Sequence, residues 1–339
     1  MKYARSPFIL VIVMHIFYSG LLNAAPCDNL EMLSDFNGKK IGLCKDTLLF
    51  ITNVLAIDID GSKYSYGMHD QGVENICNGL SPIAPSRCQN TYQQSDKGNG
   101  CFKYCVQKFK EWHESGRDID KLGEFMRSIG LGGSCGVIPK VMLQPYPNTE
   151  MFVSHTSVRY GPWVKGQPVE LIERQEAQIE PFEVPFFVIP GKFRNQQWDA
   201  TPGDYGVAIH AQDPKRFVLF VVGDVGGNLN EGSAKLHELL RGKKLSPHMM
   251  KNAIGKVVAR YGDISLNKFD DGSDLDLRIA IFRHTSSYDK RMSGEVIILQ
   301  DAHNQEELIE MIARRANEEL NKFGGVEAVL ACTEQIKKK

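Results

Sequence analysis

The sequence has almost no net charge. Its 40 Lys and Arg residues nearly balance its 41 Asp and Glu residues, which gives a formal charge of -1 at pH 7. Because binding to nucleic acid requires a concentrated positive field along the phosphate backbone, this composition predicts no nucleic-acid partner. The composition of the 339 residues is otherwise ordinary, with 42% hydrophobic and 24% charged residues, which excludes intrinsic disorder and coiled coil.

Long hydrophobic runs are also missing, except for one at the N-terminus. Lys2 and Arg5 precede the apolar residues 8–22, and small residues follow them. This layout is typical of a secretory signal peptide, which we expect to comprise residues 1–24. The protein is then expected to be secreted or periplasmic, with no membrane association after cleavage. A membrane anchor is the alternative, but the run is short for a spanning helix of about 20 apolar residues.

Cysteine is missing from residues 136–331, whereas seven of the eight cysteines lie in residues 27–135. An even number of cysteines behind a signal peptide predicts disulfide bonds, because an exported chain meets oxidising conditions. A zinc site is the alternative, but the closest pair, Cys101 and Cys105, lacks the CxxC spacing and the paired histidines of common zinc sites. We expect neither a metal nor a cofactor. The pairing stays open, because eight cysteines allow 105 connectivities.

Short apolar runs separated by turn residues dominate the rest of the chain. Their β-branched content, together with 31 glycines and 15 prolines, predicts a β-rich α+β fold whose sheet closes wholly or partly into a barrel. The expected strands lie within residues 48–61, 151–158, 183–191, 205–211, 216–227, 276–284 and 295–300. Residues 82–147 combine cysteines with helical spacing, which predicts a disulfide-tied helical insertion in a single domain of residues 25–335.

The clearest helix is expected near the C-terminus. Asn304 and Glu307 have the spacing of a capping box, and Gly324 with Gly325 predicts the end of the helix. Between these signals, the apolar residues recur at helical spacing and form one face.

Two carboxylates flank a glycine-rich connection. Residues 217–222 are expected to form a buried strand that ends at Asp224, and Asn230 is expected to cap a helix over residues 231–240. Asp224 and Glu231 would then lie together at the mouth of a sheet, which is the arrangement that acid/base cleavage of a glycosidic bond requires. The alternative is structural: Asp224 caps a turn, and Glu231 complements the helix dipole.

Five blocks in order resemble the chitosanases of glycoside hydrolase family 75. The blocks are residues 56–67 (AIDIDGSKYSYG), 152–158 with 183–191 (FVSHTSV and EVPFFVIPG), 205–211 (YGVAIHA), 217–240 (from FVLFVVGDVGG to NEGSAKLHELL) and 279–287 (IAIFRHTSS). The resemblance spans about residues 48–325 and is interrupted by the cysteine-rich segment.

The resemblance implies endo-hydrolysis of chitosan, a polymer of β-1,4-linked glucosamine, by an inverting mechanism on a fold related to the double-psi β-barrel. Asp224 and Glu231 match the essential carboxylates of the family. Asp58, Asp60 and Tyr66 lie in the first block and are expected to bind the substrate. A calcium loop at Asp58 and Asp60 is the alternative, but Lys63 stands where such a loop needs glycine.

Each carboxylate also has an expected role. Burial at the end of an apolar strand should raise the pKa of Asp224, which suits an acid. A helix N-terminus should favour the ionised form of Glu231, which suits a base. Two other functions remain open: a hydrolase of a partly acetylated polymer, and a secreted effector that binds carbohydrate or protein without cleaving it.

Overall fold

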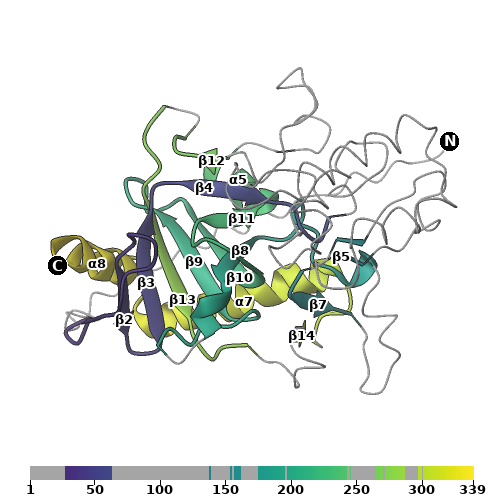
Figure 1. Cartoon of the computed structure of the whole chain (residues 1–339), viewed down its shortest axis with the longest axis horizontal. Helices are drawn as coiled ribbons and strands as arrows, with labels where there is room; N and C mark the ends of the chain where they lie inside the picture. The colour runs from purple at the N-terminus through teal and green to yellow at the C-terminus, as the bar shows by residue number, and fades with distance from the viewer. Residues whose placement is uncertain are drawn as a thin grey trace, which may run out of the picture.

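A computed structural model describes residues 27–62, 137–138, 153–154, 156–161, 175–194, 197–242, 245, 265–269, 272–286, 297–299 and 301–339. The expected signal peptide, Tyr66 and nearly all of the expected insertion 82–147 lie outside these residues. In the part that is described, a mixed sheet of 10 strands forms the centre of the fold, and helices lie against it (Figure 1).

The central sheet has the spatial order β1-β2-β3-β13-β9-β10-β8-β11-β4-β12. Its strands are β1 (Glu31–Met32), β2 (Ile41–Cys44), β3 (Thr47–Thr52), β4 (Leu55–Asp58), β8 (Phe186–Pro190), β9 (Tyr205–His210), β10 (Phe217–Gly226), β11 (Glu231–Ser233), β12 (Ser265–Leu266) and β13 (Leu277–Phe282). Two further pairs are β5 (Val137–Ile138) with β6 (Val153–Ser154), and β7 (Val158–Tyr160) with β14 (Ile297–Leu299). The helices are α5 (Ala234–Arg241), α7 (Gln305–Phe323) and α8 (Gly325–Lys338), and two 3-10 turns span Gln175–Ala177 and Gly191–Arg194.

The β-rich α+β class is confirmed, but the prediction of a wholly or partly closed barrel is not supported. Within the described residues, β1 and β12 are the two edges of the sheet and do not pair with each other. Alternate residues of the inner strands enter two separate hydrophobic cores, one on each face. The described sheet is therefore open, because its two edge strands do not pair with each other.

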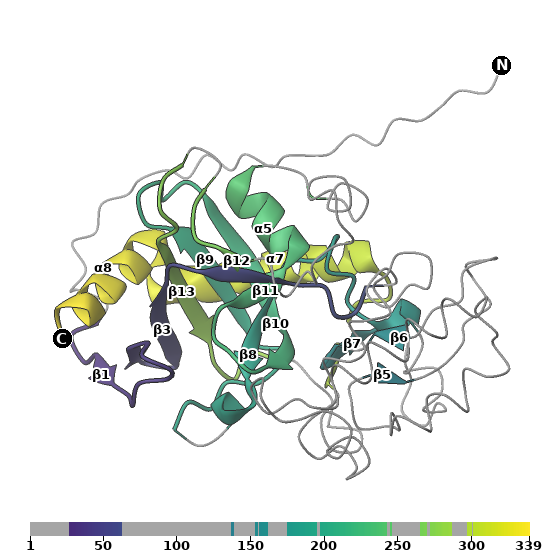
Figure 2. The same cartoon turned by 45° about the horizontal axis from the view of Figure 1, so that its top comes forward.

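The alternation of the strands shows which helix covers which face. Leu49, Val207 and Ala280 belong to the core that contains the apolar residues of α7 and α8. Their neighbours, such as Leu48 and Ala208, belong to the opposite core, which contains the apolar residues of α5. Helices α7 and α8 thus lie on one face of the sheet and α5 on the other (Figure 2). The face covered by α7 and α8 is called the α7 face below.

The predicted C-terminal helix is confirmed at both ends. The Oδ1 atom of Asn304 accepts a hydrogen bond from the backbone N–H of Glu307 at 2.9 Å, and Gly324 ends α7 with a left-handed φ of 119°. Helix α8 was not expected from the sequence, although Val329, Cys332 and Ile336 recur at helical spacing and are buried. Within the described residues, no helix is both long and apolar enough to cross a bilayer.

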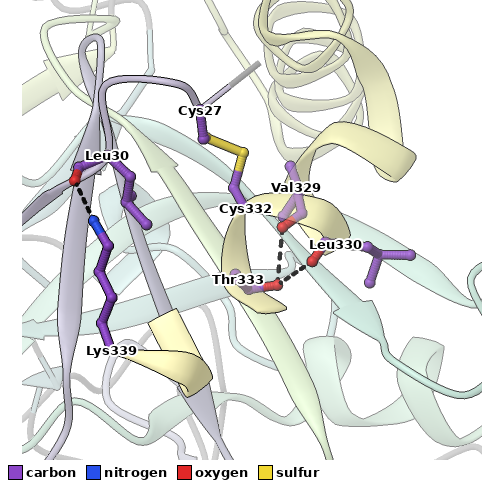
Figure 3. The surroundings of a disulfide bond; sticks show 7 residues. All are labelled: Cys27, Leu30, Val329, Leu330, Cys332, Thr333 and Lys339. Atoms are coloured by element: carbon purple, nitrogen blue, oxygen red, sulfur yellow. Dashed lines mark hydrogen bonds between the residues drawn. A yellow bond between two sulfur atoms is a disulfide. The ribbon is translucent and has the colours of Figure 1, made fainter. Parts of the chain in front are cut away.

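A disulfide between Cys27 and Cys332 joins the first described residues to α8 across 305 positions of sequence (Figure 3). Next to it, the Nζ atom of Lys339 donates a hydrogen bond to the backbone oxygen of Leu30 at 3.0 Å. These contacts hold the start of the described chain against its last helix. The predicted use of cysteine in disulfides is confirmed for this pair, and the cysteines from Cys77 to Cys135 lie outside the described residues.

Candidate active site

A β-bulge determines which face of the sheet Asp224 occupies. Val222 and Asp224 pair with consecutive residues of β8, so Gly223 is the extra residue of the bulge. In a regular strand, Asp224 would share the face of Val222, two positions before it. The bulge places it instead beside Val188, on the α7 face. Glycine is required here, because a Cβ atom at Gly223 would lie 2.7 Å from Cβ of Phe186.

Glu231 reaches the same face from the other side of β8. Its Cα partner on β8 is Val188, the same residue that pairs with Asp224. Residues paired across neighbouring strands point to the same face. Because neighbouring strands lie about 4.8 Å apart, the α-carbons of Asp224 and Glu231 are roughly 10 Å apart. One strand therefore separates two carboxylates that share a face.

Strand β4 and the turn after it add two more carboxylates. Glu231 pairs with Ala56 of β4, so Asp58, two residues further on, lies on the same face. Asp60 follows, and its backbone N–H donates a hydrogen bond to Oδ1 of Asp58 at 2.8 Å. The structure thus brings together four of the five site residues that the sequence predicted, and only Tyr66 lies outside the described residues. All four side chains are half-buried.

Two serines of one segment donate hydrogen bonds to the carboxylates. Ser157 donates both its backbone N–H, at 2.9 Å, and its hydroxyl, at 2.6 Å, to Oδ1 of Asp224. Ser154 donates its hydroxyl to Oδ1 of Asp60 at 3.1 Å. Ser154 at the end of β6 therefore supports Asp60, and Ser157 just before β7 supports Asp224.

The turn that carries Asp60 is held at Gly61. The N–H of Gly61 donates to Oγ of Ser154 at 2.9 Å, and its carbonyl oxygen accepts a hydrogen bond from the side chain of Gln175. Gly61 has a φ of +93°, and a Cβ atom there would lie 2.2 Å from the backbone oxygen of Ile179. Only glycine fits this close passage, which fixes Asp60 relative to Ser154.

Burial and mutual repulsion change the protonation of the cluster. Burial raises the pKa of Asp224 to about 7, and the charge of Asp60 adds to the rise, while the hydrogen bonds from Ser157 and Val225 oppose it. Burial, together with the charges of Asp60 and Asp224, also raises the pKa of Asp58 well above its usual value. The cluster therefore holds protonated carboxyl groups near neutral pH, which ordinary surface carboxylates do not.

The pKa of Glu231 is also raised by burial, although a hydrogen bond from Asn228 opposes the rise. This corrects the predicted environment of Glu231. It lies in β11, and α5 begins only at Ala234, where Ser233 and not Asn230 is the N-cap and its Oγ atom accepts from Leu236 N–H at 3.1 Å. Pairing with β8 and β4 keeps residues 231–233 extended, so the helix dipole does not stabilise the ionised form of Glu231.

Gly226 leaves room for the carboxylate of Glu231. A Cβ atom at Gly226 would lie 2.7 Å from Oε2 of Glu231 and 2.9 Å from Cγ1 of Val188. Gly226→Ala is therefore expected to displace the carboxylate and to lower a Glu231-dependent activity roughly tenfold. Gly227→Ala is the matched control, because a Cβ atom there meets nothing within 4 Å. Equal rates for the two variants would contradict this role of Gly226.

The four carboxylates are not among the described groups of three or more whose ligand atoms lie within 4.8 Å of one another. The described groups close enough to hold an ion together are Cys27, Cys44 and Cys332, whose sulfur atoms lie within 4.8 Å of one another. Cys27 and Cys332 share a disulfide and so offer no thiolate. Carboxyl groups with raised pKa values can exchange protons near neutral pH.

Several residues of the site were not predicted from the sequence. Ser154 and Ser157 lie in an expected strand and in a block that resembles family 75, but no role in the site was assigned to them, and neither Gly223 nor Asn228 was singled out. A scan of the sequence against protein-family models found no matching family, and a search among curated proteins found no matching relative.

Proposed function

We propose that this protein is a secreted endo-acting glycoside hydrolase that cleaves chitosan with inversion, with Asp224 as the acid and Glu231 as the base. The observation that carries the proposal is the pairing of both residues with Val188, which places two carboxylates on one face with a strand between them. The five sequence blocks that resemble family 75 support the same pair.

The separation of the two residues suits an inverting reaction. Inverting glycosidases hold their carboxyl groups about 6.5 to 9.5 Å apart, which leaves room for a water molecule between the base and the sugar. Side chains that extend from α-carbons roughly 10 Å apart on one face can reach this separation.

The reaction delivers one proton to the leaving oxygen and removes one proton from the attacking water. Asp224 donates its proton to the glycosidic oxygen as the bond from that oxygen to C1 breaks. Glu231 accepts a proton from water, whose oxygen forms the new bond to C1 from the opposite face of the ring. Asp224 leaves this step ionised and Glu231 protonated, and exchange with solvent restores both.

The assignment of roles rests on the environment of Asp224. A general acid must be protonated at the working pH, and a pKa of about 7 satisfies this requirement under neutral and mildly acidic conditions. Glu231 accepts a stabilising hydrogen bond from Asn228 and becomes the base.

The remaining carboxylates suit a cationic substrate. Asp58 and Asp60 lie beside the acid/base pair, and an ammonium group of glucosamine would favour their ionised forms and so oppose the rise in the pKa of Asp58. An acetylated sugar lacks that charge. We infer that Asp58 and Asp60 bind the amino groups of the polymer, and Tyr66 remains a proposed contact next to them.

Incubation of the purified protein with chitosan and, separately, with chitin tests the proposal. Soluble oligomers of mixed length are expected from chitosan at a rate at least about tenfold above that from chitin, and the first product observed by NMR should be the α-anomer. Products from chitin alone would indicate a different polymer. Binding to chitosan without any product would contradict catalysis and favour the non-catalytic effector.

A further inference from the structure

The two carboxylate oxygens of Asp224 have different surroundings. Oδ1 accepts three hydrogen bonds, from the N–H and hydroxyl of Ser157 and from the N–H of Val225 at 2.8 Å. Oδ2 accepts none from the described residues. A carboxyl oxygen with three donors is saturated, so a proton on Asp224 belongs on the other oxygen.

Ser157 is itself held firmly. The hydroxyl of the preceding residue, Thr156, donates to the backbone oxygen of Val158 at 2.7 Å, and its backbone N–H donates to Oε1 of Gln178 at 3.1 Å. Val158 is fully buried in the core of the α7 face. These contacts fix the backbone on both sides of Ser157, so its two donors have a fixed direction.

We propose that Ser157 is a positioning residue for Asp224. Its two donors hold Oδ1 as the accepting oxygen, so that the neutral acid carries its proton on Oδ2, the oxygen left for the substrate. This proposal rests on the proposed function only for its kinetic consequence, because the state of the carboxyl group can be measured without a substrate.

The hydrogen bonds from Ser157 and the surrounding negative charges shift the pKa of Asp224 in opposite directions. Asp60 in the turn after β4, Asp58 in β4 and Glu231 in β11 are the described carboxylates that face Asp224 or share its face, and like charges favour the protonated form. The hydroxyl of Ser157 favours the ionised form. Its removal should therefore raise the pKa of Asp224.

Ser157→Ala removes the hydroxyl and keeps the backbone donor. Since an acid acts only while it is protonated, kcat/KM of the wild type should fall as pH rises through the pKa of Asp224. In Ser157→Ala, this high-pH limb should move upward by about one unit, because a hydrogen bond to a charged group is lost. Ser157→Thr keeps a hydroxyl and should leave the limb in place. A loss of rate in Ser157→Ala with an unmoved limb would show a merely structural role and overturn the proposal.

Titration of the Asp224 side-chain carboxyl carbon by NMR gives a readout without substrate. The signal is assigned by its absence from Asp224→Asn, and its midpoint should rise in Ser157→Ala and not in Ser157→Thr. Ser157→Cys, which retains a weaker donor, should give an intermediate midpoint and serves if Ser157→Ala does not fold. Equal midpoints in these variants and the wild type would overturn the proposal. If the protein cleaves no polymer but the titration midpoint of Asp224 still rises from the wild type through Ser157→Cys to Ser157→Ala, the proposed function is refuted and the role of Ser157 stands.

Discussion

Asp224→Asn and Glu231→Gln are each expected to lower the rate of chitosan hydrolysis by about 100-fold or more, since each removes one of the two groups that transfer protons. Both replacements keep the size of the side chain. In Asp224→Asn, the amide oxygen of the introduced side chain can still accept the hydrogen bonds that Ser157 and Val225 donate to Oδ1 of the wild-type residue. The measurement is kcat on soluble chitosan for the wild type and both variants.

The fold of these variants can be checked by circular dichroism and by the pH dependence of unfolding. Asp224 has a folded-state pKa of about 7 against an ordinary value of 3.8, so the folded wild type binds its proton more tightly than the unfolded chain. The stability linked to this proton is present at low pH and is lost as pH rises from 3.8 to about 7. The Asn side chain of Asp224→Asn does not titrate, so the stability of this variant does not fall over that pH range. Its free energy of unfolding relative to the wild type should therefore be higher above neutral pH than at low pH.

The assignment would be contradicted if both variants were still active. If Asp224→Asn and Glu231→Gln fold normally and hydrolyse chitosan at near wild-type rates, these carboxylates do not transfer the protons. Loss in one variant alone would leave only that residue in the reaction.

Most of the longer strands could be predicted from the sequence, but β2 was not expected, β11 was predicted as part of a helix, and the order of the strands could not be predicted. The apolar run at residues 277–282 indicates a buried strand, and β13 is one. Its position between β3 and β9 depends on pairings with residues far away in sequence, such as Phe282 with Thr47. The length and composition of a run do not specify its neighbours. For this reason the sequence predicted a wholly or partly closed barrel where the sheet is open.

The four clustered carboxylates were singled out from the sequence, but two features of their geometry could not be predicted. The spacing from Val222 to Asp224 suggests a shared face, and only the observed pairing with β8 reveals the bulge at Gly223. Similarly, the capping pattern at Asn230 favours a helix from Glu231, whereas pairing with β4 and β8 delays it to Ala234. In both cases tertiary pairing overrides a local pattern.

The association of Asp58 with Glu231 shows the same limit. The resemblance to family 75 placed both residues in matching blocks, but these blocks lie far apart in the sequence. The parallel pairing of β11 with β4 is what brings the two residues onto one face.

Replacement of Cys27 and Cys332 by alanine is expected to lower the free energy of unfolding by about 2 to 5 kcal/mol. The disulfide closes a loop of 305 residues and so restricts the unfolded chain strongly. Alanine is preferred to serine, because both cysteines are buried and a hydroxyl there would need a partner. Urea unfolding of the double variant without reductant measures the change.

Lys339→Ala provides the control for this experiment, because it removes the hydrogen bond to Leu30 beside the disulfide and leaves the disulfide in place. A loss of only about 1 kcal/mol is expected from it. The rate of chitosan hydrolysis should be unchanged in the folded double variant, since the disulfide joins the segment before β1 to α8, whereas the site is built on β10, β8, β11 and β4. An equal loss of unfolding free energy in the double variant and in Lys339→Ala would contradict a stabilising role of the disulfide. It would mean that residual structure in the unfolded chain keeps α8 near β2, β3 and β13 and so already closes the long loop.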